Sequence, residues 1–171
     1  MTIPFDTLCQ NAFVVADIEA GIAYWTDVMG VGPFFLFPPL RFEDGELHGK
    51  PAVLEYRAAI AYAGELMIEL IEPNGPSIFQ EFLDSGGRGV QHNSMFVRDL
   101  DGAEQRLIAR GGQKVQALTA PNGSRICFYE MPGEAPYVIE ISQVAPALTA
   151  RLEAVKAASR DWDGKTCLMA G

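Results

Sequence analysis

One motif occurs twice in this chain, and this internal repeat constrains the fold more than any other feature. The segment QNAFVVADIEA, which begins at Gln10, aligns residue for residue with HNSMFVRDLDG, which begins at His92. Each copy has an apolar strand followed by an Asp suited to cap a helix, Asp17 in the first copy and Asp99 in the second. Apolar residues at helical spacing follow, and each helix is predicted to end at glycine.

Three further apolar segments follow each predicted helix. They cover residues 34–37, 53–62 and 65–72 in the first copy and 114–118, 125–130 and 137–142 in the second, with the polar stretch 38–51 as a loop. The sequence therefore predicts an α+β fold in which two paired βαβββ modules form a curved, eight-stranded mixed sheet around a central cleft. We place the modules at 1–75 and 89–143, a linking helix at 76–88, and a C-terminal helix and tail at 144–171.

Four polar side chains are predicted to meet on one face of this sheet. Alternate residues of a strand point to the same side, and the repeat places Gln10 opposite His92 in the alignment and Glu69 opposite Glu140. Two carboxylates on apolar strands are costly to bury, and a divalent cation between them would remove that cost. Residues of the same parity are expected to line a substrate pocket: Ala12, Val14, Met67, Ser94 and Phe96.

These motifs resemble the vicinal-oxygen-chelate superfamily, which includes glyoxalase I, methylmalonyl-CoA epimerase, the extradiol dioxygenases and the bleomycin-resistance proteins. The resemblance covers about residues 8–143 and is carried by QNAFVVADI, ELIEP, HNSMFVRDL and YVIEI. It implies one divalent metal ion held by one residue from each of four strands. The resulting set of Gln10, Glu69, His92 and Glu140 is similar to that of the Zn-type glyoxalase I enzymes, and it implies Zn, Ni, Co or Mn.

Iron is less favoured by this comparison. The extradiol dioxygenases need two histidines and one glutamate around iron, and His48, the second histidine of the chain, is predicted to lie in a loop. The resemblance instead implies a glyoxalase-like isomerase, epimerase or lyase. In such an enzyme Glu140, together with Glu69, would move a proton on a carbon next to a metal-bound substrate oxygen.

The glutathione anchors of glyoxalase I are mostly missing. Val14 and Pro73 stand where that family has an arginine and an asparagine, although Arg88 matches a position that contacts the glutathione carboxylate. We therefore expect an apolar or aromatic small molecule, or an acyl-CoA, as the substrate. Phe35, in the apolar segment GVGPFFLFPPL, is a further candidate for the pocket wall.

Two other functions stay open at this point. Some members of the superfamily bind antibiotics without catalysis, so a small-molecule binding or resistance protein is the main alternative, and an extradiol-type dioxygenase is a weaker one. Many members also build their cleft across a dimer, so the resemblance implies a homodimer.

Charge and composition exclude other partners. A net charge of −9 and the lack of a basic stripe argue against nucleic acid. No run of about eighteen apolar residues predicts a membrane span. The N-terminal sequence lacks a signal-peptide pattern, and the three cysteines show no CxxC pair, so we expect a cytoplasmic protein with reduced thiols.

Overall fold

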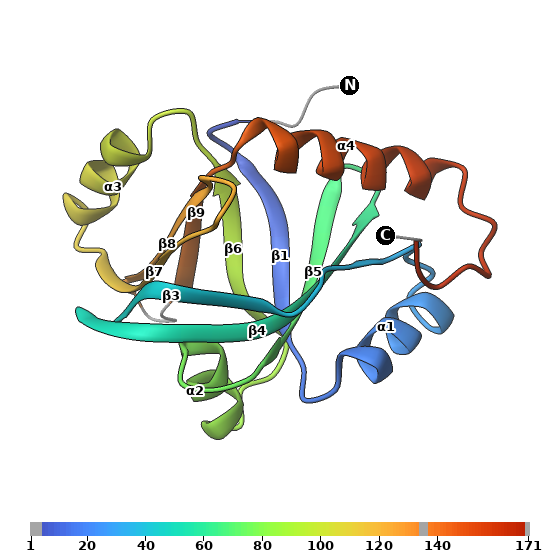
Figure 1. Cartoon of the computed structure of the whole chain (residues 1–171), viewed down its shortest axis with the longest axis horizontal. Helices are drawn as coiled ribbons and strands as arrows, with labels where there is room; N and C mark the ends of the chain where they lie inside the picture. The colour runs from blue at the N-terminus through green and yellow to red at the C-terminus, as the bar shows by residue number, and fades with distance from the viewer. Residues whose placement is uncertain (1–4, 134–136, 170–171) are drawn as a thin grey trace.

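A single mixed sheet dominates the computed structural model, which describes residues 5–133 and 137–169 (Figure 1). Three short segments lie outside the described residues: 1–4 at the start of the first predicted module, 134–136 within the second, and 170–171 at the end of the predicted tail. The strands are β1 Leu8–Val14, β2 Phe35–Leu36, β3 Leu40–Leu47, β4 Lys50–Ala63, β5 Leu66–Pro73, β6 Val90–Phe96, β7 Gln113–Thr119, β8 Arg125–Met131 and β9 Tyr137–Gln143. The helices are α1 Ile18–Asp27, α2 Ile78–Asp84, α3 Leu100–Ile108 and α4 Pro146–Arg160.

The sheet closes on itself. The strand order is β2-β4-β3-β7-β8-β9-β6-β1-β5, and β4 also pairs with β5, so that every strand except β2 belongs to a closed ring. Within the ring β1 runs parallel to β5 and β6 runs parallel to β9, whereas β1 and β6 are antiparallel. The predicted α+β fold with a curved mixed sheet is confirmed.

The two repeats begin in the same way. The Asp17 carboxylate accepts a hydrogen bond from the backbone N–H of Ala20 at 2.9 Å, and the Asp99 carboxylate accepts one from that of Gly102 at 3.0 Å. Both are N-caps that satisfy a backbone donor in the first turn of the helix. The predicted starts of α1 and α3 are therefore confirmed.

The prediction of a loop at 38–51 was wrong. Residues 40–47 form β3, which pairs with β4 on one side and β7 on the other, and β4 starts at Lys50. Polar side chains alternate with the buried Phe42 because only one face of this hairpin is covered, and His48 and Gly49 make its turn with positive φ values of 48° and 73°. The segment predicted as a strand at 34–37 contributes only β2, at the edge of β4.

Helices close both ends of the ring and cover its outside (Figure 1). One buried cluster packs α2 against the inner faces of the strands, and a second packs α4 against them at the opposite end. The outward residues of β5 pack under α1, and those of β8 and β9 pack under α3, as strand parity predicts. Among the described residues, no helix is both long and apolar enough to cross a membrane.

Candidate metal centre

Strand register brings the four predicted residues together within one chain. In the first repeat Glu69 of β5 pairs with Ala12 of β1, and in the second Glu140 of β9 pairs with Ser94 of β6. Gln10 and His92 lie two residues before Ala12 and Ser94, so they occupy equivalent places. The antiparallel pairing of β1 with β6 then sets the two halves side by side.

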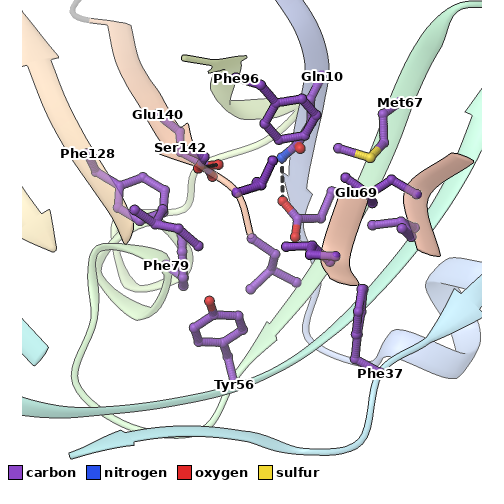
Figure 2. A pocket seen from close by; sticks show the side chains of 16 residues that line it. Gln10, Phe37, Tyr56, Met67, Glu69, Phe79, Phe96, Phe128, Glu140 and Ser142 are labelled. Carbon is purple, nitrogen blue, oxygen red and sulfur yellow. Dashed lines mark hydrogen bonds between the residues drawn. The ribbon is translucent and has the colours of Figure 1, made fainter. Parts of the chain in front are cut away.

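The polar atoms of this group converge. Gln10 Nε2 donates to Glu69 Oε2 at 2.5 Å, as Figure 2 shows, and His92 Nε2 lies 3.1 Å from Glu140 Oε2 and 3.8 Å from Glu69 Oε2. One potential ligand atom each from Glu69, His92 and Glu140 lies within 4.8 Å of the others. Such a group of one imidazole and two carboxylates has the donor types that divalent transition metals accept.

His92 directs its Nε2 atom towards the centre of this group. The side chain is buried, and its Nδ1 lies 2.6 Å from Gln91 Oε1, an acceptor to which a protonated Nδ1 donates. Nε2 is buried and has no aligned hydrogen-bond partner among the described residues. The rings of Phe79 and Phe128 lie 5.9 and 5.1 Å away and fix the plane of the imidazole. A buried Nε2 that faces two carboxylates without an aligned hydrogen bond fits a bound metal ion.

The two glutamates have different surroundings. Ser94 Oγ and Ser142 Oγ both donate to Glu140 Oε1, at 2.9 and 2.5 Å. Burial alone would raise the pKa of Glu140. The contacts with His92 and with the two hydroxyls have the larger effect and lower this pKa below the usual 4.5. For Glu69, burial and the charge of Glu140 raise the pKa well above 4.5, and the hydrogen bond from Gln10 opposes them. Glu140 is therefore the carboxylate that stays ionised.

An apolar cavity leads to this group. A space of about 330 Å³ is bordered by β3, β4, the 120–126 segment and α4, and it adjoins the smaller space around Gln10 and Glu140. Both spaces are lined by the same junction residues: Phe37, Tyr56, Glu69, Ile126 and Leu148. Neither lining includes a lysine or an arginine. The polar group therefore lies at the inner end of a largely apolar pocket.

The predicted pocket residues take different places. Met67 and Phe96 line the inner space (Figure 2), and Ser94 lies beneath it as a donor to Glu140. Ala12 and Val14 are buried in the adjoining core.

The remaining two predicted pocket residues line neither space. Phe35 packs edge-on against Phe37, with ring centroids 5.0 Å apart, and the Arg151 guanidinium lies over its ring. Arg88 is exposed in the loop before β6 and lines neither space.

Several lining residues were missed by the sequence reasoning. They come from β4, α2, β8 and α4: Tyr56, Phe79, Phe128 and Leu148. Tyr56 and Phe128 have the inward parity of predicted strands, so a search of every strand for inward aromatic residues could have found them. Phe79 and Leu148 belong to helices that close the ring, and no strand pattern indicates them.

The paired repeats, the closed sheet and the convergent His and Glu side chains define a protein of the vicinal-oxygen-chelate type. The chain belongs to the glyoxalase/bleomycin resistance protein/dioxygenase superfamily, whose family model matches residues 9–128. No curated protein matches it in sequence.

Solved structures share this fold. Methylmalonyl-CoA epimerase from Mycobacterium tuberculosis has a TM-score of 0.60 and 25% identity, over 88% of this chain and 95% of that one. A Streptomyces coelicolor methylmalonyl-CoA epimerase variant in complex with 2-nitronate-propionyl-CoA has a TM-score of 0.59 and 17% identity, over 84% of this chain and 97% of that one. A hypothetical protein from Bacillus halodurans C-125 has a TM-score of 0.54 and 18% identity, over 81% of this chain and 94% of that one. At the identities of the last two, the likeness concerns the fold alone.

Proposed function

We propose that this protein is a metal-dependent isomerase, epimerase or lyase that moves a proton on a carbon next to a substrate oxygen. The observation that carries the proposal is the buried His92 Nε2, which makes no aligned hydrogen bond to a described residue and converges with the carboxylates of Glu69 and Glu140 at the inner end of an apolar cavity. A binding protein without catalysis would have no need to bury two carboxylates together at this place.

His92 Nε2, Glu140 and Glu69 would hold the ion, with Gln10 beside them. Nitrogen and carboxylate donors suit Zn, Ni, Co or Mn. When bound, such an ion supplies Lewis acidity, which makes a C–H bond next to a coordinated oxygen easier to deprotonate. Gln91, which holds His92 Nδ1, would keep the imidazole in the tautomer that this role requires.

The proton-moving role is best assigned to Glu69. Glu140 is held on one oxygen by two serine hydroxyls and faces His92 with the other, so it has little freedom to turn. Glu69 accepts a hydrogen bond from the side-chain amide of Gln10 but none from a serine hydroxyl among the described residues, and it borders both parts of the cavity. This assignment differs from the sequence-based expectation, in which Glu140 was the main base.

The likeness to methylmalonyl-CoA epimerase from Mycobacterium tuberculosis supports an epimerase or isomerase reaction, and acyl-CoA thioesters belong among the substrates to test. The apolar lining supports a hydrophobic reacting end of the substrate. The lining residues offer no cation for a glutathione carboxylate, which supports the expectation that the substrate is not a glutathione adduct.

Hydrogen exchange tests this proposal even while the product is unidentified. The Zn-loaded protein is incubated in D2O with a panel of acyl-CoA thioesters and apolar ketones, and deuterium at the carbon next to the carbonyl is measured by mass spectrometry. We expect exchange with at least one compound, and a loss of about 100-fold or more in Glu69→Gln. Glu72→Gln, on the same strand near the start of α1, is the matched control. Tight binding of these compounds with no exchange at all would contradict the proposal and favour a binding protein.

A further inference from the structure

The hydroxyl of Tyr56 stands free at the junction of the two parts of the cavity. Tyr56 is 7% exposed, and its ring is held by Phe42 and Phe79, with centroids 5.5 and 5.2 Å away. Figure 2 shows the ring rising from β4 with its hydroxyl directed into the space below Glu69 and Glu140. No described residue forms a hydrogen bond with this hydroxyl.

The Tyr56 hydroxyl opens onto the cavity, so a bound molecule that displaces water from it must supply an acceptor or leave it without a partner, at a cost of about 1–3 kcal/mol. Apolar packing does not need it: Phe79 and Phe128 fill neighbouring positions of the lining without a polar atom. A tyrosine hydroxyl is protonated at neutral pH and is a good donor. The Tyr56 hydroxyl therefore has the properties of a group that meets an oxygen of a bound molecule.

The charges around the cavity limit what that molecule can be. Glu69 and Glu140 would balance a divalent ion, and the lining contains no lysine or arginine that could compensate a further negative charge. The nearby Arg41 and Arg57 on the outer side of β3 and β4 are already paired with carboxylates. A substrate carboxylate placed in this cavity would therefore be buried without a counter-charge, which is costly.

We propose that Tyr56 is a specificity-determining residue that donates a hydrogen bond to an oxygen of a neutral, apolar substrate, and that the cavity rejects molecules with a carboxylate at the inserted end. This inference rests on the proposed function, because it takes the cavity beside Glu69 to be the substrate site. It narrows the substrate class to neutral ketones, phenols, alcohols or thioester acyl groups without a free carboxylate. Selection of this kind is strong when a buried polar group would otherwise stay unpaired.

A series of three related probes tests the inference. Binding of 2-acetylnaphthalene, naphthalene and 2-naphthoate is measured by fluorescence titration, both with EDTA and with Zn²⁺. We expect wild-type protein to bind the ketone about tenfold more tightly than either of the others. Tyr56→Phe should weaken ketone binding by about tenfold and leave naphthalene binding unchanged. Tyr62→Phe is the matched control, because Tyr62 is buried on the same face of β4 but lines neither part of the cavity.

Three results would overturn the inference. They are naphthoate binding as tight as ketone binding, ketone binding that is unchanged in Tyr56→Phe, and failure of all three probes to bind. The wild-type comparison of ketone with naphthoate needs no variant, so a folding defect in Tyr56→Phe cannot hide the answer. Calorimetric titration with Zn²⁺ alone separates the two proposals. Zn²⁺ binding without selectivity for the ketone overturns only the role of Tyr56. Selectivity for the ketone without Zn²⁺ binding overturns only the metal-dependent function.

Discussion

Asn93 Nδ2 donates a hydrogen bond to Asn11 Oδ1 at 2.7 Å, and the two asparagines face each other in the antiparallel pairing of β6 with β1. They are also the same position of the two repeats. A pseudo-twofold axis therefore passes between them, and the residues that precede them, Gln10 and His92, are related by this axis. The candidate metal centre thus lies where the repeats meet, and its four side chains are two pairs of equivalent residues.

The contact between Gln91 and His92 predicts a role in metal affinity. Gln91→Leu removes the acceptor for His92 Nδ1, so the imidazole loses its preferred tautomer and orientation. We expect Zn²⁺ affinity to fall by about 10- to 100-fold in a calorimetric titration. Gln91→Glu keeps an acceptor at this place and should retain most of the affinity. An equal loss in both variants would show that the orientation of His92 does not depend on this contact.

The raised pKa of Glu69 predicts an unusual pH dependence of stability. In metal-free protein the folded state holds the Glu69 proton more tightly than the unfolded chain, so this carboxyl favours folding below pH 4.5 and loses that effect as the pH rises above it. Glu69→Gln should therefore become more stable relative to wild type as the pH rises from 4.5 towards neutrality. Urea unfolding in EDTA across this range measures the difference between the two proteins.

Glu140 provides the internal control for that experiment. Its pKa is lowered, so its contribution is present above pH 4.5 and is lost only as the pH falls below that value. The unfolding free energy of Glu140→Gln should therefore approach that of wild type as the pH falls below 4.5. For Glu69→Gln, the change relative to wild type occurs instead as the pH rises above 4.5. A free-energy difference between Glu69→Gln and wild type that does not change with pH would contradict the raised pKa of Glu69.

The packing of α2 predicts a large loss of stability on truncation of Phe79. Phe79 is fully buried and its ring lies 5.2, 5.9 and 5.5 Å from those of Tyr56, His92 and Phe128. Phe79→Ala should cost about 3–5 kcal/mol of unfolding free energy. Phe82→Ala, on the same helix but only partly buried, should cost less in the same urea titration. The reverse order would show that Phe79 does not close this end of the ring.

The repeat accounts for most of what the sequence could predict. Gln10, His92, Glu69 and Glu140 could be aligned because strand parity and repeat position are both local properties of the chain. The strand β3 was missed because its outer face is polar, so its composition resembles that of a loop. Tyr56 was missed because its importance depends on neighbours far away in the sequence, which only the closed sheet brings together.

All four candidate ligands belong to one chain, and this predicts that metal binding does not require assembly. The β3–β7 and β4–β5 pairings close the sheet within a single copy. The homodimer that the family resemblance implies stays a prediction, which sedimentation velocity would test. Whatever the oligomeric state, we expect Zn²⁺ affinity per chain to stay constant as the protein is diluted. An affinity that falls together with dissociation of a dimer would contradict this expectation.

Anomalous X-ray diffraction from crystals grown with Zn²⁺ would locate the ion itself. We expect an anomalous peak bounded by His92 Nε2 and the carboxylates of Glu69 and Glu140. Among the described residues, one other group could attract the ion, the more exposed carboxylates of Asp17, Glu19 and Glu72 near α1. A peak at that outer group alone, or no peak beside His92 at saturating Zn²⁺, would contradict the proposed metal centre.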